Sequence, residues 1–164
     1  MRKLVLILMV LVILPVTLFA DWGIGGAAFY KSPVLMGQPI DTTNLNVNQF
    51  SFGGDLRFTL SVFQAEALVL FSAGDVNSLN AYLDAGLVFD VAILRLSLGA
   101  GPCFSYSFGN SSPTQAGLNA KAGADVMLGP ISFGVSYIMA LNLNTGINVT
   151  TRSGLLGFDV IFWM

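Results

Sequence analysis

Residues 50–60 read Phe-Ser-Phe-Gly-Gly-Asp-Leu-Arg-Phe-Thr-Leu, and this stretch decides the fold. The bulky apolar residues occupy even-numbered positions: Phe50, Phe52, Leu56, Phe58 and Leu60. The odd-numbered positions, which form the other parity, hold Ser51, Gly53, Asp55, Arg57 and Thr59. Successive side chains of a β-strand point to opposite faces, so a period of two gives one apolar and one polar face. A helix repeats every 3.6 residues and would mix the two sets. The stretch therefore predicts a strand.

The same alternation recurs along the chain. It is strong in residues 80–91, 94–108 and 131–141, and weaker in residues 21–30, 63–72, 116–128 and 154–164. Each segment approaches or exceeds the length of about 9 to 11 residues that a tilted membrane strand needs. Together with residues 50–60 the sequence predicts eight strands, an even number, as bacterial outer-membrane barrels have.

The predicted connections alternate between long and short. The long ones, residues 31–49, 73–79, 109–115 and 142–151, are rich in Asn, Ser, Thr, Gly and Pro, whereas the short ones are Ser61-Val62, Val91-Ala92-Ile93 and Gly129-Pro130. Outer-membrane barrels have long loops outside and short turns in the periplasm. We therefore expect up-and-down strand order with both termini on the periplasmic side.

Composition indicates which face of the strands meets lipid. Apolar residues make up 54% of the chain and charged residues only 10%, against about 25% charged in ordinary soluble domains. An eight-stranded barrel has an interior that side chains just fill, so the many Phe and Leu residues fit better outside, against lipid. An open sheet would leave backbone groups unpaired in hydrocarbon. The sequence thus predicts an all-β protein, a closed antiparallel up-and-down transmembrane β-barrel of eight strands.

The N-terminus has the pattern of an export signal. Met1-Arg2-Lys3 precedes an apolar run from Leu4 to Leu14 and a segment that ends in Ala20. A charged region, an apolar region and a small residue in this order are typical of a cleavable signal peptide. We expect cleavage after Ala20, with residues 1–20 as the signal peptide and residues 21–164 as one barrel domain. A retained anchor of about 17 residues is the alternative, at the short limit for a membrane span.

Charge and rare residues exclude several functional classes. Without Arg2 and Lys3, five basic residues face nine acidic ones, a formal net charge of −4 for residues 21–164, so nucleic acid is not an expected partner. The chain has no histidine and a single cysteine, Cys103. Histidine is the commonest metal ligand and the usual base of hydrolases. We expect no enzymatic activity, no cofactor and no metal site, and Cys103 as a small filler of the lumen.

Charged residues cluster on the parity that would face the lumen. With two-residue turns, Arg57 falls opposite Glu66, and Asp90 falls opposite Arg95. The predicted lumen network comprises Asp55, Arg57, Glu66, Asp84, Asp90, Arg95, Lys121, Asp125 and Asp159. Such charges are costly to bury unless they are paired or hydrated. Two interpretations stay open: a plug that rigidifies the barrel, and a narrow path for ions or water that favours cations.

A second candidate site lies at the predicted outer rim. Closure of the barrel would bring Lys31 and Arg152 together beside Tyr30, and two cations there could hold a lipid phosphate. The alternative is two long side chains that reach the interface without a ligand. Trp22, Phe63 and Phe133 near the inner edge, with Tyr30, Phe50, Phe71 and Tyr106 near the outer one, are typical of aromatic girdles.

The C-terminal strand carries the most specific resemblance. Leu156, Phe158, Val160, Phe162 and Met164 occupy alternate positions. In this strand and in their overall layout, residues 21–164 resemble the small eight-stranded outer-membrane β-barrel family, which includes OmpX, the OmpA membrane domain and, more loosely, OmpW. Its members usually end in Phe, whereas this chain ends in Met164. The resemblance implies the bacterial cell outer membrane, its lipid, the barrel-assembly machinery and periplasmic chaperones as partners; no binding residue carries over.

Three functions follow as hypotheses. The first is a monomeric barrel with a structural or surface-interaction role through its extracellular loops, of which Lys31–Gln49 is long and nearly uncharged. The second is a narrow channel for small or apolar solutes, as in OmpW-like proteins. The third is a soluble periplasmic barrel that binds a lipid. Conductance across planar bilayers separates the first two, and extraction without detergent separates the third.

Overall fold

The computed structural model describes residues 20–31, 47–73, 77–109, 114–142 and 153–164. Within these ranges the elements, in chain order, are β1 (Ala20–Lys31), the 3-10 turn η2 (Val47–Gln49), β2 (Phe50–Leu60), β3 (Phe63–Ser72), β4 (Ser78–Val91), β5 (Leu94–Ser107), β6 (Gln115–Leu128), β7 (Ile131–Asn142) and β8 (Ser153–Trp163). No helix in the described ranges has the length and hydropathy of a membrane-spanning segment.

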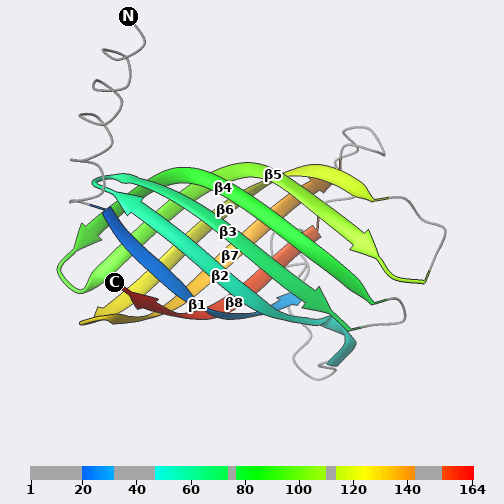
Figure 1. Cartoon of the computed structure of the whole chain (residues 1–164), viewed down its shortest axis with the longest axis horizontal. Helices are drawn as coiled ribbons and strands as arrows, with labels where there is room; N and C mark the ends of the chain where they lie inside the picture. The colour runs from blue at the N-terminus through cyan, green and yellow to red at the C-terminus, as the bar shows by residue number, and fades with distance from the viewer. Residues whose placement is uncertain (1–19, 32–46, 74–76, 110–113, 143–152) are drawn as a thin grey trace, which may run out of the picture.

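The eight strands form one closed barrel in sequence order, and every neighbouring pair is antiparallel (Figure 1). β1 and β8 close the barrel, from Gly23 opposite Trp163 to Lys31 opposite Leu155. The predicted closed antiparallel up-and-down barrel is therefore confirmed. Strand boundaries agree with the predicted ones within two residues, because the alternation of apolar and polar residues extends to the strand ends.

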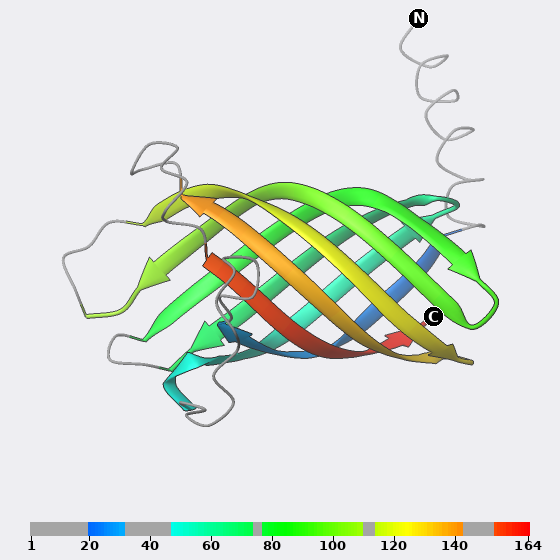
Figure 2. The same cartoon turned by 180° about the vertical axis from the view of Figure 1, so that it is seen from behind.

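Three two-residue turns join β2 to β3, β4 to β5 and β6 to β7. Their first residues, Ser61, Ala92 and Gly129, have φ of 55°, 56° and 67°. Tight hairpins need such positive values at their central positions. The second turn is shorter than predicted, because Val91 belongs to β4 and pairs with Leu94. These turns lie at the same end of the barrel as the C-terminus of β8 (Figures 1 and 2).

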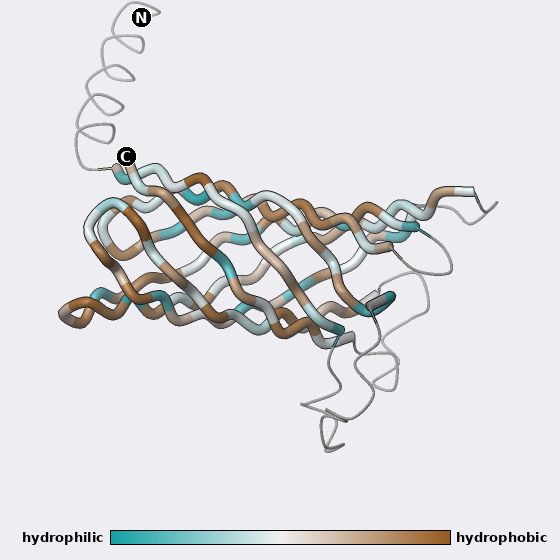
Figure 3. Tube along the Cα trace, turned by 90° about the horizontal axis from the view of Figure 1, so that it is seen from below, coloured by the Kyte–Doolittle hydropathy of each residue, from teal (hydrophilic) through white to brown (hydrophobic). Residues whose placement is uncertain are grey.

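The outer surface is apolar along every strand. Phe52, Phe63, Leu98 and Val135 are each more than half exposed, and hydrophobic and hydrophilic residues alternate along the tube in Figure 3. Aromatic side chains gather toward both ends of this surface. Trp22 packs on Phe58 at 4.7 Å between ring centroids near the turn end, and Tyr30 packs on Phe50 at 5.0 Å at the other end. Such a surface suits lipid rather than water.

Small and large residues face each other at the seam where β1 and β8 close the barrel. Inward-facing partners across the seam include Gly23 with Trp163, Gly25 with Ile161, and Phe29 with Gly157. In each pair a glycine faces a large side chain, and a Cβ at Gly157 would collide with the ring of Phe29. An aromatic side chain that packs over a cross-strand glycine covers the part of the backbone that glycine, without a side chain, leaves exposed.

The interior contains an apolar cluster that the sequence pattern did not predict. Ala27, Phe29, Leu68, Leu70, Tyr82, Ile138 and Leu155 pack together on the lumen side. They come from the halves of their strands that lie farther from the two-residue turns. The prediction that most Phe and Leu residues face lipid did not extend to these residues, which lie inside because a narrow lumen excludes water and needs side chains to fill it.

Candidate functional site

A layer of charged side chains crosses the middle of the lumen. Asp55 and Arg57 come from β2, Glu66 from β3, Asp84 from β4, Lys121 and Asp125 from β6, and Asp159 from β8, and each is at most 7% exposed. They face inward because each lies on the parity opposite to the lipid-facing residues of its strand. The register places Arg57 opposite Glu66 and Asp90 opposite Arg95, as two-residue turns require.

Arg57 is the centre of this layer. Its Nε and Nη2 donate to Asp55 Oδ2 at 3.0 and 2.8 Å, and its Nη1 donates to Asp125 Oδ1 at 2.9 Å. Nη2 also lies 3.0 Å from Asp159 Oδ1. Guanidinium groups suit this position because five N–H donors in one plane can serve several carboxylates at once. Arg57 thus connects β2 with β6 and β8.

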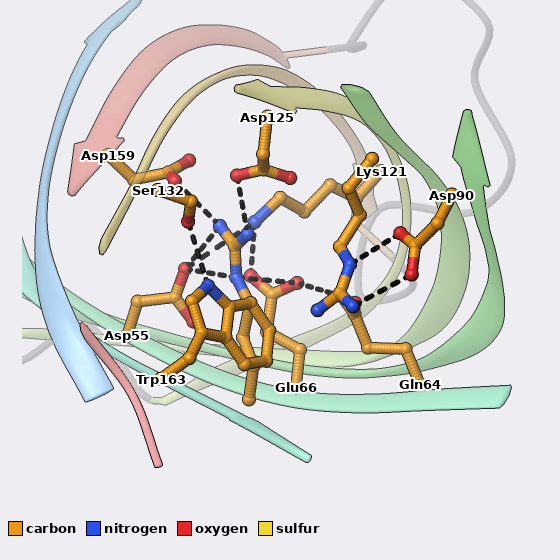
Figure 4. Close-up of polar contacts among 11 residues, drawn as sticks. Asp55, Gln64, Glu66, Asp90, Lys121, Asp125, Ser132, Asp159 and Trp163 are labelled. Carbon is orange, nitrogen blue, oxygen red and sulfur yellow. Dashed lines mark hydrogen bonds and ion pairs between the residues drawn. The ribbon is translucent and has the colours of Figure 1, made fainter. Parts of the chain in front are cut away.

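Glu66 has a different main partner from the predicted one. Its Oε2 lies 3.8 Å from Arg57 Nε, which makes this the longest contact of the guanidinium. The hydrogen bond of Glu66 Oε1 comes instead from Lys121 Nζ, which also lies 3.8 Å from Asp55 Oδ2. The expected pair of Arg57 and Glu66 exists only as a secondary contact, because the curvature of the closed barrel brings β6 side chains to the middle of the lumen. Figure 4 shows Asp55, Glu66, Lys121, Asp125 and Asp159 converging.

A separate polar group closes the turn end of the lumen. Arg95 Nε and Nη2 donate to the two oxygens of Asp90 at 2.7 and 2.9 Å. The Arg95 guanidinium carbon also lies 4.5 Å from the ring centroid of Trp163, whose Nε1 donates to Ser132 Oγ at 2.9 Å (Figure 4). Stacking of a cation on an indole face is favourable. The side chain of Asp90 is 54% exposed, so this group marks the mouth of the barrel.

Two interior features went unrecognised in the sequence. The inward position of Trp163 could have been found, because Leu156, Phe158, Val160, Phe162 and Met164 fill the outward parity of the same strand. The apolar cluster gave a weaker signal. In residues 63–72 the inward-facing positions are polar at Gln64, Glu66 and Ser72, but Leu68 and Leu70 between them are apolar.

The other predicted site residues have mixed outcomes. Lys31 ends β1 and is exposed, but Arg152 lies outside the described residues, so the lipid-phosphate site stays a prediction. The signal segment, apart from Ala20, and the interiors of the long loops also lie outside them. Cys103 faces the lumen, partly buried against the apolar cluster, in keeping with a filling role. Within the described ranges no group of three or more His, Cys, Asp or Glu side chains could hold a metal ion.

Comparisons with solved structures show which proteins share this architecture. The N-terminal β-barrel domain of Pseudomonas aeruginosa OprF superposes with a TM-score of 0.67 at 14% identity, over 88% of this chain and 97% of that one. Neisserial surface protein A gives 0.53 at 16%, over 87% and 96%. Ail, the attachment invasion locus protein of Yersinia pestis, gives 0.52 at 17%, over 88% and 97%.

Sequence comparisons add nothing to this picture: no protein-family model matches the chain, and no curated protein matches it. Identities of 14 to 17% establish a shared fold and nothing finer. The chain therefore has the fold of the small eight-stranded outer-membrane β-barrels.

Proposed function

We propose that the chain is an integral protein of the bacterial outer membrane whose barrel is a closed structural support for its extracellular loops. The observation that carries this proposal is the filled cross-section of the lumen. Arg57 reaches from β2 to Asp125 on β6, and Lys121 reaches from β6 to Glu66 on β3. Each of these four side chains is at most 3% exposed. We infer that these contacts block a continuous path for water or ions through the lumen at this level.

Outer-membrane location is supported by the physics of the outer surface. Phe52, Leu98 and Phe158 are about half exposed or more, and closure of the sheet leaves no unpaired strand edge. Backbone N–H and C=O groups inside a bilayer must form hydrogen bonds within the protein, and only helices and closed barrels satisfy all of them. The chain shares its fold with barrels that come from bacterial outer membranes. Export would use residues 1–20 as a signal peptide cleaved after Ala20.

A surface-interaction role rests on the layout of the connections. The described strand ends leave residues 32–46 and 143–152 as the long connections, and all of the two-residue turns lie at the opposite end. The structural relatives named as a surface protein and as an attachment and invasion protein have the same fold. We propose the loop from Lys31 to Gln49 as the main contact surface. The barrel would be monomeric, surrounded by outer-membrane lipid and assembled by the barrel-assembly machinery and periplasmic chaperones.

Conductance in planar bilayers tests the closed barrel. We expect the purified, refolded protein to give no current steps, because the Arg57 and Lys121 contacts fill the lumen. The matched variant Arg57→Ala, Lys121→Ala removes both cross-lumen contacts and should raise the frequency of current steps. Ohmic steps from the unaltered protein, at a frequency equal to that of the variant, would contradict the proposal.

A narrow channel for apolar solutes is the second candidate, and the apolar cluster favours it. Phe29, Leu68 and Ile138 have no exposed surface, so the outer half of the lumen offers an apolar environment. Permeation would require these side chains to move apart. Uptake of a small apolar dye into vesicles that contain the barrel tests this candidate. A rate equal to that of protein-free vesicles would exclude it.

A further inference from the structure

Asp84 lies in the lumen without an ion-pair partner among the described residues. The residue is 7% exposed, and neither of its carboxylate oxygens accepts a hydrogen bond. The amide of Asn119 interacts with Asp84, but the hydrogen bonds of its Nδ2 within 3.5 Å go to the carbonyl oxygens of Gly101 and Pro102 at 3.2 and 3.3 Å. Among the described residues no ammonium or guanidinium forms an ion pair with Asp84. A buried carboxylate in this state is costly unless another group compensates it.

Asp84 borders a small cavity. The cavity has a volume of about 10 Å³, and its polar lining comprises Gln64, Glu66, Asp84, Ser97 and Lys121. Oε1 of Gln64 is also buried without a hydrogen-bond donor, because the amide nitrogen of Gln64 is turned toward Glu66 Oε2 at 3.3 Å. A space of about this size holds one water molecule or one ion of similar radius. Gln64 on β3 and Asp84 on β4, which both have unpaired side-chain oxygen atoms, thus line the same small cavity.

The charge around this cavity is negative. Glu66 and Asp84 face each other directly across β3 and β4, and Lys121 is the cation beside them. Lys121 Nζ is already bound to Glu66 Oε1 and lies 3.8 Å from Asp55 Oδ2. Like charges directly opposite each other in a sheet are destabilising. The three cavity charges sum to −1, so one positive charge would make the group neutral.

The wider layer has the same imbalance. Apart from the pair of Asp90 and Arg95 at the mouth, the lumen network has two cations, Arg57 and Lys121. They face five buried carboxylates, Asp55, Glu66, Asp84, Asp125 and Asp159. The four other than Asp84 all contact Arg57 within 3.8 Å. Asp84 is the one carboxylate of this layer that forms no ion pair within 4 Å among the described residues, so an additional counter-charge belongs beside it.

We propose that the barrel binds one small monovalent cation of the size of Na⁺ between Asp84 and Gln64. Asp84 supplies carboxylate oxygens and Gln64 supplies Oε1, which are the hard oxygen ligands that such cations prefer. The single negative charge of the cavity group favours a monovalent over a divalent ion. The size of the cavity excludes organic cations such as N-methylglucamine. The ion would act as a structural counter-charge that is taken up when the barrel closes.

Salt-dependent stability tests the site. The protein is refolded into phosphatidylcholine vesicles in NaCl or in N-methylglucamine chloride of equal ionic strength, and its urea unfolding is measured. A ligand that binds only the folded state raises the folding equilibrium constant in proportion to its concentration above Kd. We expect about a tenfold rise in this constant for each tenfold rise in Na⁺ in that range. N-methylglucamine should give no such rise.

Variants assign the effect to the cavity. Asp84→Asn should abolish the dependence on Na⁺, whereas Asp21→Asn, the same change at an exposed carboxylate of β1, should preserve it. Gln64→Leu should weaken the dependence and serves as the test variant if Asp84→Asn does not fold. Three results would overturn the proposal. They are equal stability in both salts, a Na⁺ effect retained in Asp84→Asn, and stabilisation by acid or by Mg²⁺ without any response to Na⁺.

Discussion

Arg57 on β2 and Asp125 on β6 are joined across the full width of the barrel, with 2.9 Å between Nη1 and Oδ1. Three strands separate β2 from β6 in either direction around the closed barrel, so the two residues stand on opposite walls. The contact therefore fixes the distance between walls that share no backbone hydrogen bonds. Both side chains are 2% exposed, and loss of one partner would leave the other charge buried.

Replacement of Arg57 by Met should destabilise the barrel strongly. The change leaves four carboxylates without their shared cation, and breaking a buried ion pair in this way costs about 3 to 5 kcal/mol. Urea unfolding in lipid vesicles measures the loss. Arg95→Met is the matched control, because the partner of Arg95, Asp90, has a 54% exposed side chain and can be hydrated. Equal losses in both variants would contradict the central role of Arg57.

Replacement of Leu68 by Ala tests the apolar cluster. Leu68 faces the lumen with no exposed surface, whereas its neighbour Val69 faces lipid and is 42% exposed. A cavity in a packed interior costs about 2 to 5 kcal/mol for Leu→Ala. We expect Leu68→Ala to lose this much free energy of unfolding and Val69→Ala to lose less than half of it. The interior would not be closely packed if the two losses were similar.

Two adjacent glycines on β1 should respond in opposite ways to the same change. A Cβ at Gly25 would point into the lumen, collide with the carbonyl oxygen of Val160 and lie 2.7 Å from Ile161 Cδ1. A Cβ at Gly26 would face lipid, with Gly53 O at 3.9 Å as its nearest contact. Gly25→Ala should therefore disturb closure between β1 and β8 and reduce heat-resistant mobility on gels. Gly26→Ala should behave as the unaltered protein, and a loss of mobility there would refute this account of the seam.

The two tryptophans of the chain report the two faces of the barrel. Trp22 is 48% exposed on the outer surface, whereas Trp163 is 8% exposed and bonded to Ser132 in the lumen. In vesicles of brominated phospholipid, Trp163→Phe leaves Trp22 as the only indole, and its fluorescence should be strongly quenched. Trp22→Phe leaves Trp163, which should be quenched far less. Similar quenching of both would mean that Trp163 and the other odd-numbered residues of β8 face lipid rather than the lumen.

The sequence by itself determined the strands, the register of the hairpins and the lipid-facing parity. These properties are local: alternation within residues 50–60 needs no distant contact, and a two-residue turn such as Ser61-Val62 sets which residues of β2 and β3 face each other. The pairs of Arg57 with Glu66 and of Asp90 with Arg95 across the hairpins followed from the same reasoning.

Only the tertiary structure decided which charges meet inside. Lys121 reaches Glu66 from a strand that is not its neighbour, and Arg57 reaches Asp125 across the lumen. Closure of the barrel and the tilt of its strands set these distances, and neither is encoded in any short segment. The inward packing of Phe29, Leu68 and Ile138 has the same origin. A narrow, closed interior excludes water, so polar and apolar side chains alike must fill it. Whether an inward-facing residue joins the charged layer or the apolar cluster depends on its height along the barrel axis.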